Sequence, residues 1–378
     1  MKQIILSTVA VGTLVLADGD ITSQELSVDA PIEVKQSSIF DRVHLKNDLR
    51  LRYESIERDD KHNKYRNRYR LRLGAKIDLI DDFQFEVGMR SGFANPTSGN
   101  QTFLDDKPLK DYFLQSLRFN VLGFKYKTGN STYSIGRQPY MMYRPIKSQL
   151  VWDNDVSMNG VNYQYKDDTK IITFGANQPT LEEASEARDN VNLFLAQYVY
   201  RTKLNSAKLN VGAGIYYYDG LKGNTALFGK SKGNTLINGI YANDYHIVEG
   251  FGELQLKDIF GKSLKMAVGM TYNFATDDNN FGYDFGVQLG KAKYVGDWQV
   301  KYSYTNLQED ATLGAYSDSD NFGGGTGAKG HAIRAKYKMD KSLYLAGNFF
   351  FDTLYASKSK TDIEADYKRV QLDVIVKF

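Results

Sequence analysis

Polar and apolar residues alternate along the last segment of the chain, residues 366–378 (DYKRVQLDVIVKF). Val370, Leu372, Val374, Val376 and Phe378 take every second position, and the residues between them are mostly charged or polar. A period of two predicts a β-strand with one apolar and one polar face. Because an unpaired strand at the end of a chain exposes an edge, we expect this strand to close on another one. Taken alone, the segment also fits an ordinary amphipathic edge strand.

The same alternation recurs along most of the chain from residue 43 onward. We predict sixteen strands, at residues 43–57, 65–79, 83–92, 112–127, 131–138, 159–166, 170–177, 192–203, 207–219, 244–257, 263–276, 281–295, 298–305, 331–339, 342–355 and 366–378. The segment 192–203 is apolar on both faces, so the pattern does not assign its register.

Long and short connections alternate between these predicted strands. The long series comprises residues 58–64, 93–111, 139–158, 178–191, 220–243, 306–330 and 356–365, and only 277–280 in that series is short. An even strand number, about 10 residues per span, and long loops at one end only predict an all-β fold, the transmembrane antiparallel β-barrel. A soluble β-sandwich does not predict this alternation, and a solenoid needs a sequence repeat that the chain lacks.

The cost of placing charge in lipid decides which face points inward. Arg68, Arg70 and Arg72 lie mid-strand, and each would cost roughly 2–4 kcal/mol at the bilayer midplane. Together they would cancel much of a typical domain stability of about 5–15 kcal/mol. We therefore expect the polar faces to line a lumen, which at about 16 to 18 strands is wide enough for water. Tyrosines and phenylalanines near strand ends, at 216–218 and 349–351, predict an aromatic girdle, although β-propensity also explains their abundance.

The first residues have the layout of a secretory signal peptide. Lys2 precedes an apolar run that ends at Ala17, so we predict a signal peptide at residues 1–17, cleaved after Ala17. The run is shorter than the about 20 apolar residues of a membrane-spanning helix. Residues 18–42 have no clean period, and we interpret them as an N-terminal lead segment on the periplasmic side of a barrel domain at 43–378.

Composition removes several classes of function. The chain has no cysteine, which excludes a disulfide framework and a thiolate metal site. Its formal net charge of +3 over 378 residues lacks the basic footprint of a nucleic-acid partner. We predict no cofactor and no metal site.

Three stretches carry a resemblance to a known family. They read NDLRLRYESIERDDKHNKYRNRYRLRLGAKIDL from residue 47, GMRSGFANPTSGNQTFLDD from residue 88 and SIGRQPYMMYRPIKSQLVWDNDVSMNGVNYQY from residue 134. They resemble the putative porins of Gram-negative outer membranes, most strongly over residues 43–166. The resemblance implies a homotrimeric, water-filled diffusion channel in the outer membrane, whose third extracellular loop folds inward to narrow the pore. The long third loop here, 139–158, fits that expectation.

The resemblance also implies partners but no particular solute. These partners are outer-membrane lipids, lipopolysaccharide and the barrel-assembly machinery. The terminal Phe378, preceded by alternating apolar residues, resembles the signal by which that machinery recognises its clients.

A constellation of charged residues on neighbouring strands and on the third loop is the candidate functional site. The strands supply seven arginines, which we call the arginine wall: Arg50, Arg52, Arg68, Arg70, Arg72, Arg90 and Arg118. The third loop supplies Asp153 and Asp155 together with Arg144 and Lys147. Since charged rings set selectivity in pores, we expect a transverse field and a modest preference for anions. The alternative is that the arginines are solvated lumen residues paired with Asp48, Glu54, Asp78 and Glu86.

Other motifs do not lead to a site. Residues 325–330 fit G-x-G-x-x-G but lie between two strands, without a helix to hold a phosphate. Asp318 and Asp320 begin like a calcium loop, yet Phe322 and Lys329 occupy positions that need oxygen ligands. The four histidines, His44, His62, His246 and His331, are scattered over separate strands and loops.

Rival functions stay open beside a general diffusion channel. A substrate-selective channel shares every feature above. An outer-membrane hydrolase is disfavoured because no serine has a recognisable nucleophile context, so we expect no enzyme. An adhesin or receptor would act through loops 220–243 and 306–330, neither of which has a binding signature.

Overall fold

The structure is a computed structural model that describes residues 39–80, 82–92, 95–103, 117–179 and 190–378. The predicted signal peptide and most of the predicted lead segment lie outside the described residues. None of the helices in these ranges is long and apolar enough to cross a membrane.

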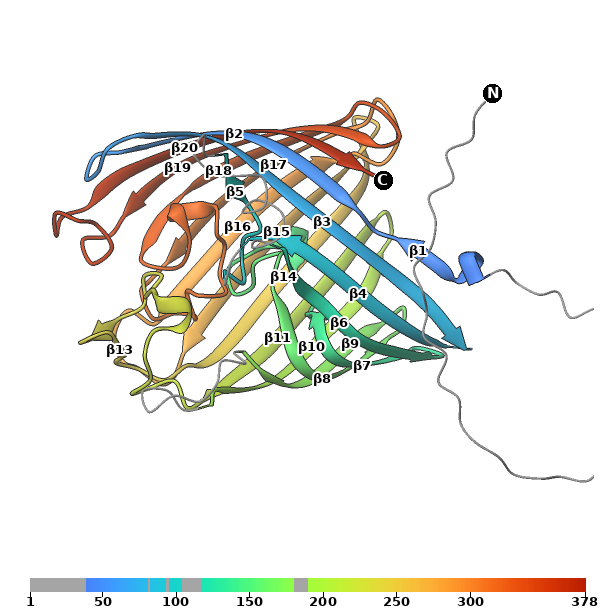
Figure 1. The fold of residues 1–378 in the computed structure, drawn as a ribbon, viewed down its shortest axis with the longest axis horizontal. Coiled ribbons are helices and arrows are strands. Elements are labelled where there is room, and N and C mark those ends of the chain that lie inside the picture. Colours follow the sequence, from blue (N-terminus) through green and yellow to red (C-terminus); the bar gives the residue numbers. More distant parts are fainter. Residues whose placement is uncertain (1–38, 81, 93–94, 104–116, 180–189) are drawn as a thin grey trace, which may run out of the picture. The chain divides into compact units, whose positions relative to one another are not determined.

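Sixteen long strands form one antiparallel barrel (Figure 1). They are β2 (Asp48–Arg58), β3 (Lys64–Ile80), β4 (Phe83–Ser91), β6 (Leu117–Thr128), β7 (Ser131–Pro139), β8 (Ser157–Lys166), β9 (Lys170–Gln178), β10 (Asn192–Leu204), β11 (Ala207–Asp219), β14 (His246–Ile259), β15 (Lys262–Asn273), β16 (Phe281–Gly290), β17 (Trp298–Leu307), β18 (Ala328–Lys338), β19 (Leu343–Leu354) and β20 (Ala365–Lys377).

Shorter elements decorate this barrel. The short strands are β1 (Val43–Leu45) and β5 (Gln101–Thr102), which both pair with β3, and the hairpin β12 (Leu236–Ile237) with β13 (Ile240–Tyr241). Single 3-10 turns are η1 (Ile39–Arg42), η2 (Pro145–Lys147), η3 (Leu227–Gly229) and η4 (Asn321–Gly323).

Each long strand pairs with the next one along the chain, and the last closes on the first. β2 pairs with β20 from Asp48 opposite Lys377 to Arg58 opposite Tyr367. Backbone hydrogen bonds of 3.3 Å in both directions between Asn47 and Phe378 extend this seam to the final residue. The terminal strand therefore has no free edge, as its alternation led us to expect.

The predicted fold class is confirmed: an all-β, closed antiparallel barrel of sixteen strands. β11 has the predicted bounds, and most other strands differ from prediction by one to three residues. The predicted strand 43–57 is broken into β1 and β2 at residues 46 and 47, β6 is described only from Leu117, and β16 ends at Gly290 although the predicted strand runs to 295. The reason at β16 is local: Gly290 has a φ of 76°, and the chain turns through residues 291–297 instead of extending β16.

The apolar faces point outward and the polar faces inward. On β15, for example, Val268 and Met270 are 58% and 55% exposed, while Thr271 and Asn273 on the opposite face are buried. The membrane is not part of the structure. An exposed apolar surface around a polar interior is nevertheless the reverse of the soluble pattern and matches a barrel wall in lipid.

Two tyrosines assigned to the aromatic girdle lie elsewhere. Tyr216 and Tyr218 are fully buried inside the barrel, and only Tyr217 between them faces outward. The prediction was wrong for these two because a period of two places neighbours at 216 and 217 on opposite faces. Phe350 is likewise buried inside, beneath the guanidinium of Arg334.

The apolar inner face also resolves the register of β10. Leu193, Leu195 and Val199 point inward and are buried, while Phe194 and Tyr198 point outward. Both faces of β10 are apolar because loop residues pack on its inner face, where a lumen-facing strand would otherwise meet water. One cluster joins Leu193 and Leu195 to Trp152, Tyr216 and Tyr316.

The long connections gather at one end of the barrel and most of the short turns at the other (left and right in Figure 1). We call these the long-loop end and the short-turn end. As far as the long connections are described, the third loop, residues 140–156 between β7 and β8, and the seventh loop, residues 308–327 between β17 and β18, enter the lumen.

Candidate functional site

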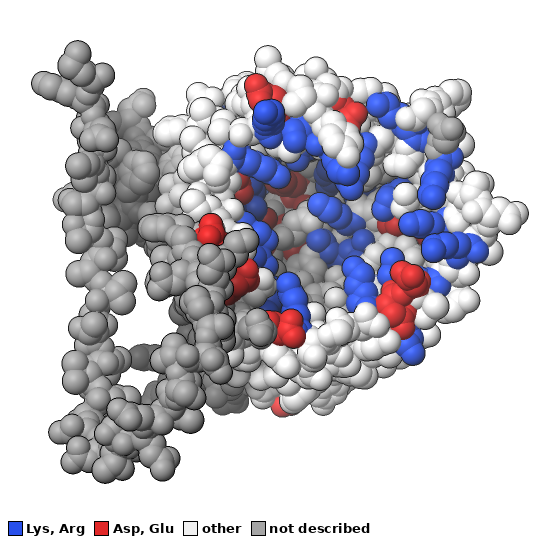
Figure 2. Space-filling view, turned by 90° about the vertical axis from the view of Figure 1, so that its right-hand side faces the viewer, with Lys and Arg blue, Asp and Glu red and all other residues white. Residues whose placement is uncertain are grey.

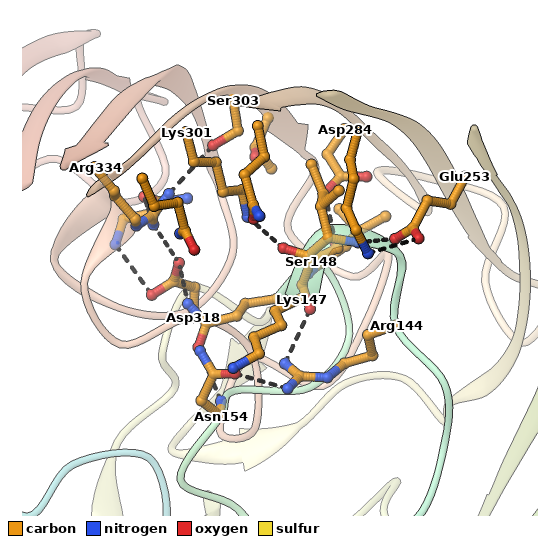
Figure 3. Close-up of a pocket in the computed structure, with 18 of the residues that line it drawn as sticks. Arg144, Lys147, Ser148, Asn154, Glu253, Asp284, Lys301, Ser303, Asp318 and Arg334 are labelled. Atoms are coloured by element: carbon orange, nitrogen blue, oxygen red, sulfur yellow. Dashed lines mark hydrogen bonds and ion pairs between the residues drawn. The ribbon is translucent and has the colours of Figure 1, made fainter. Parts of the chain in front are cut away.

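The third loop crosses the inside of the barrel to the wall formed by β14 to β17. The backbone N–H of Ile146 donates to Glu253 of β14 at 2.6 Å, and the Nζ of Lys301 on β17 donates to the Ile146 carbonyl at 3.1 Å. The Ser148 hydroxyl donates to Asp284 of β16. Figure 3 shows these wall side chains pointing toward the loop. The loop is thus held in the lumen by hydrogen bonds to the far wall.

An apolar anchor fixes the other end of the third loop. Trp152 is completely buried, with its ring centroid 5.2 Å from that of Tyr216 and 5.9 Å from that of Tyr316. Burying an aromatic side chain of this size contributes about 1.5–3 kcal/mol. Because Tyr216 belongs to β11 and Tyr316 to the seventh loop, this one residue joins a strand and two loops.

The seventh loop bonds directly to the third, and we call this contact the L3–L7 junction. The Asp153 N–H donates to the Tyr316 carbonyl at 2.7 Å, and the Ser319 N–H donates to the Asp153 carboxylate at 2.9 Å. The Asp318 N–H donates to the Gln149 carbonyl at 3.2 Å. The seventh loop therefore narrows the lumen together with the third. Sequence reasoning anticipated only the third, because no local pattern in 308–327 reports a contact with residues so distant in the chain.

Four arginines of the wall make close contacts with carboxylates, and Arg50 lies 3.9 Å from Asp373. Arg52 makes a bidentate pair with Asp373 at 2.6 and 2.8 Å, and Arg70 lies 2.7 Å from Asp48. Arg72 binds Asp155 of the third loop, and Arg68 lies 3.4 Å from Glu54. Only one of these four carboxylates, that of Asp155, comes from the third loop.

The other three arginines of the wall bond mainly to loop amides and carbonyls. Arg50 donates to the Asn100 side chain, and Arg118 donates to the Gly92 carbonyl at 3.0 Å. Arg90 donates to the carbonyls of Asn95 at 2.6 Å and Asp155 at 3.2 Å. The second loop, residues 92–103 as far as it is described, thus joins the third at this wall.

The remaining predicted loop residues have separate environments. Arg144 donates within its own loop, to the carbonyls of Ser148 and Trp152 and to the Asn154 side chain, and does not reach the wall arginines. Asp153 accepts the N–H groups of Asp155 and Ser319 and makes no ion pair among the described residues. Of the two predicted loop carboxylates, only Asp155 faces the arginine wall.

Two important residues were missed by the sequence reasoning. Asp320 of the seventh loop lies 3.5 Å from Arg52 and 3.1 Å from Arg369, and Arg369 of β20 also binds Glu54. Asp320 had been considered only as part of an incomplete calcium loop. Arg369 could have been found, because it has the inward phase of the terminal strand.

The alternative, in which the wall arginines pair with acidic residues of the strands, holds for two of the four acidic residues considered. Glu54 and Asp48 pair with arginines of the wall or its neighbours, as that scheme requires. Glu86 instead pairs with Lys76 and Lys125, and Asp78 with His44. The wall therefore contains both ion pairs between strand residues and contacts with carboxylates of the loops.

Burial and neighbouring charges separate the loop carboxyls into two kinds. The arginines Arg72 and Arg70 hold the pKa of Asp155 far below its ordinary value despite burial, and Arg369 and Arg52 do the same for Asp320. Burial raises the pKa of Asp153, and nearby Asp155 and Asp318 raise it further. Burial likewise raises the pKa of Asp318.

A cavity of about 530 Å³ lies between the third loop and the wall, toward the short-turn end. Its lining includes seven basic residues, namely Arg144, Lys147, Lys265, Lys291, Lys301, Arg334 and Lys336, against three acidic ones, Glu253, Asp284 and Asp318. Figure 2 views this end and shows basic side chains around a central hollow. Within the described residues, Lys147, Lys291 and Lys336 have no carboxylate within ion-pair distance.

The described part of the chain contains no group of three His, Asp or Glu residues placed to hold a metal ion. The site is therefore described by its charges and its shape.

Comparison with protein families gives one match over most of the chain. A family model described as "putative porin" matches residues 45–235 and 241–378. A comparison with curated protein sequences gave no match.

Solved structures share the fold at low sequence identity. OprB of Pseudomonas putida, in its high-pH structure, is 14% identical with a TM-score of 0.58, and the match covers 90% of this chain and 95% of that one. A triple mutant of the Rhodopseudomonas blastica porin is 12% identical with a TM-score of 0.47, over 89% of this chain and 100% of that one. A loop-deletion mutant of the Vibrio cholerae outer-membrane protein OmpT is 11% identical with a TM-score of 0.48, with the same coverage.

Proposed function

This chain belongs to the putative porin family and is an outer-membrane porin channel, and we propose that it carries small hydrophilic solutes and ions by passive diffusion with a modest preference for anions. The family and the barrel fold point to a channel rather than an enzyme. In this proposal the long-loop end faces the outside of the cell and the short-turn end faces the periplasm.

The charge balance of the lumen supports the anion preference. In the cavity at the short-turn end seven basic residues face three acidic ones, and Lys147, Lys291 and Lys336 have no carboxylate within ion-pair distance among the described residues. A low-dielectric wall focuses the field of such charges on the water inside. Electrostatic screening reaches about 10 Å at 0.1 M ionic strength and about 3 Å at 1 M, so the preference should weaken as salt rises.

Planar-bilayer recording of purified protein tests this proposal. We expect ohmic single-channel conductance, and in a KCl gradient a reversal potential displaced toward that of chloride. Replacing Lys147, Lys291 and Lys336 with Gln should move it toward zero.

A matched control removes the same charge at the barrel rim, outside the lining of this cavity. Lys127, Lys203 and Lys208 are exposed near the short turns, and their replacement by Gln should change the reversal potential less than the replacement in the cavity. A cation-selective wild-type channel would contradict the anion preference. The absence of conductance, together with hydrolysis of lipid, would instead favour the hydrolase.

We also propose the homotrimer and the membrane and assembly partners that the resemblance implies. Light scattering of the detergent-solubilised protein, corrected for bound detergent, should give three chains per particle. One chain per particle would contradict the trimer and leave the channel proposal in place.

A further inference from the structure

A second cavity opens inside the barrel at the long-loop end. It has a volume of about 650 Å³ and lies between the ends of β2, β3 and β20 and parts of the second, fifth, seventh and eighth loops. Among the described residues, its lining contains ten lysines and arginines, one histidine and no aspartate or glutamate. The cavity at the short-turn end, by contrast, has acidic residues among its basic ones.

Six lysines from three loop regions converge on this cavity. They are Lys61 and Lys64 beside the first loop, Lys230 and Lys232 of the fifth loop, and Lys358 and Lys360 of the eighth. Lys61, Lys64, Lys230 and Lys360 are exposed. Within the described ranges, none of the six side chains has a carboxylate at ion-pair distance. The acidic residue of the first loop next to Lys61, Asp60, accepts hydrogen bonds from the Nε of Arg58 at 2.7 Å and from its Nη2 at 2.6 Å.

Four arginines complete the lining. Besides Arg58 these are Arg66, Arg68 and Arg369, which all pair with the single carboxylate of Glu54. Arg369 additionally contacts Asp320. Positive charge therefore remains in excess even where the arginines have partners.

We propose that this cavity is a binding site for a compact anion that carries several negative charges, such as a short chain of phosphate groups. A multivalent anion can contact lysines from different loops at once, whereas chloride can meet only one or two of them. The lining side chains of β2, β3 and β20 are on the inward faces of these strands, so the ligand is a solute entering the lumen and not a lipid headgroup.

This inference rests on the proposed function only for the placement of the site at the outer mouth of the channel. Converging charges in a recess raise the local concentration of an oppositely charged solute, so the site would also supply such solutes to the pore.

Lys358 should make anion binding at this site depend on pH. It is half-buried in the eighth loop, where its Nζ donates to the carbonyls of Gly324 and Thr326, and desolvation together with Lys232 lowers its pKa to about 7. Other charged groups facing it are Asp352 of β19, Glu309 of the seventh loop and Arg58 of β2. A bound anion favours the charged lysine and raises its pKa. Binding near neutral pH should therefore take up protons and become tighter as pH falls from 8 to 6.

Isothermal titration calorimetry of the full-length purified protein in detergent, with inorganic tripolyphosphate as the probe, tests the proposal. We expect saturable binding that is at least tenfold tighter than binding of sulfate under the same ionic strength. In two buffers of different ionisation enthalpy at pH 7, the heats should differ in the direction of proton uptake.

The site variant replaces Lys61, Lys64 and Lys230 with Gln, three exposed residues that make no described ion pair. Binding of tripolyphosphate should weaken at least tenfold. The variant that replaces Lys127, Lys203 and Lys208 removes the same charge at the opposite end and should bind as the wild type does. Equal loss in both variants would show a general charge effect and overturn the site.

Conductance separates this inference from the proposed function. Protein that conducts in the bilayer but does not bind tripolyphosphate would overturn the site and leave the channel proposal standing. Protein that binds as predicted but does not conduct would leave the site standing and contradict the channel. Binding that does not distinguish tripolyphosphate from sulfate would also overturn the proposal, since it requires several charges on one ligand.

Discussion

Individual charged residues form ion pairs and hydrogen bonds that cannot be predicted from the face of the strand on which they lie. Alternation correctly places Arg52, Arg70 and Arg90 inside, where all three are buried. It does not show that Asp373 lies opposite Arg52, because the two residues are at opposite ends of the chain. Nor does it show that Arg90 meets backbone carbonyls rather than carboxylates. Strand phase is local information, whereas partner choice depends on closure of the barrel and on the paths of the loops.

These partners change how the arginine wall should be probed. From the sequence, replacing Arg68, Arg70 and Arg72 with Glu would shift selectivity without loss of folding, since both charges would face water. In the structure these arginines neutralise Glu54, Asp48 and Asp155. The triple replacement would crowd carboxylates together, so a change on the loop side is more informative.

Replacing Asp155 with Asn removes the loop charge that faces the wall. Arg72 and Arg70 lose a carboxylate partner, and the lumen gains one net positive charge. We expect the reversal potential in a KCl gradient to move further toward chloride. The free energy of unfolding should fall by about 2 kcal/mol, less than the roughly 3–5 kcal/mol for a partner removed from a dry interior.

The exposed Asp168 in the turn between β8 and β9 supplies the control for this variant. Asp168→Asn makes the same charge change at the barrel rim and should alter neither quantity. If Asp155→Asn leaves the reversal potential where it was, the pair with Arg72 lies outside the path of the ions.

At the scale of elements, the strands follow from the sequence and the loop paths do not. Period two, turn residues and loop lengths suffice for sixteen strands with nearly correct bounds. The apolar inner face of β10 was the one available signal that something docks inside the barrel. The pattern alone does not interpret this apolar face, because a strand that faces a water-filled lumen is expected to be polar. The buried positions of Tyr216 and Tyr218 have the same cause, since Trp152 of the third loop packs against both.

The third loop should set the size limit of the channel. Replacing residues 145–150 with glycine and serine keeps the length of the loop and the anchor Trp152, but removes the side chains of Ile146, Ser148 and Leu150 that reach the wall. We expect a higher single-channel conductance and faster swelling of liposomes in larger sugars. A glycine and serine replacement at residues 276–279, in the loop between β15 and β16, is the control, and a size limit unchanged in both would place the constriction elsewhere.

The L3–L7 junction should loosen as pH rises. Asp153 and Asp318 have pKa values above the ordinary value of about 3.9, so their stabilising contribution is complete below that value and is lost as pH rises through the raised pKa. Asp155 and Asp320 have lowered pKa values, so their contribution stays intact between pH 5 and pH 8. We expect more frequent current fluctuations at pH 8 than at pH 5.

The variant Asp153→Asn cannot ionise at the junction and should flatten this pH dependence. Asp168→Asn serves again as the control and should fluctuate with pH as the wild type does. Fluctuations that increase toward acid pH would contradict the assignment.

At the scale of the whole molecule, we expect the terminal strand to act in assembly as well as in packing. The ring of Phe378 is 61% exposed, although its backbone is bonded to Asn47. A side chain so exposed contributes little to the stability of the finished barrel. This leaves recognition by the assembly machinery as the property that its position and residue type predict.

Replacing Phe378 with Ala should separate these two properties. Refolding of the purified variant in detergent should give the same heat-modifiable barrel as the wild type, because the backbone seam is retained. In cells the amount in the outer membrane should fall severalfold, with chains left in the periplasm, as measured by fractionation and blotting. Normal levels in the outer membrane would remove the assembly role, and failure to refold would assign the residue a structural one.

The seam between β2 and β20 also implies an order of events in time. Asp320 of the seventh loop contacts Arg52 on one side of the seam and Arg369 on the other, beneath strands whose partners are more than 300 residues apart. The seam between β2 and β20 cannot form until the last strand is present. Once it has formed, the seventh loop has less room to enter the barrel and reach both strands. We therefore expect the seventh loop to lie inside an open sheet before the first and last strands meet. The rate of closure would then depend on how fast this loop finds its place, as expected when a contact of such long sequence separation comes last.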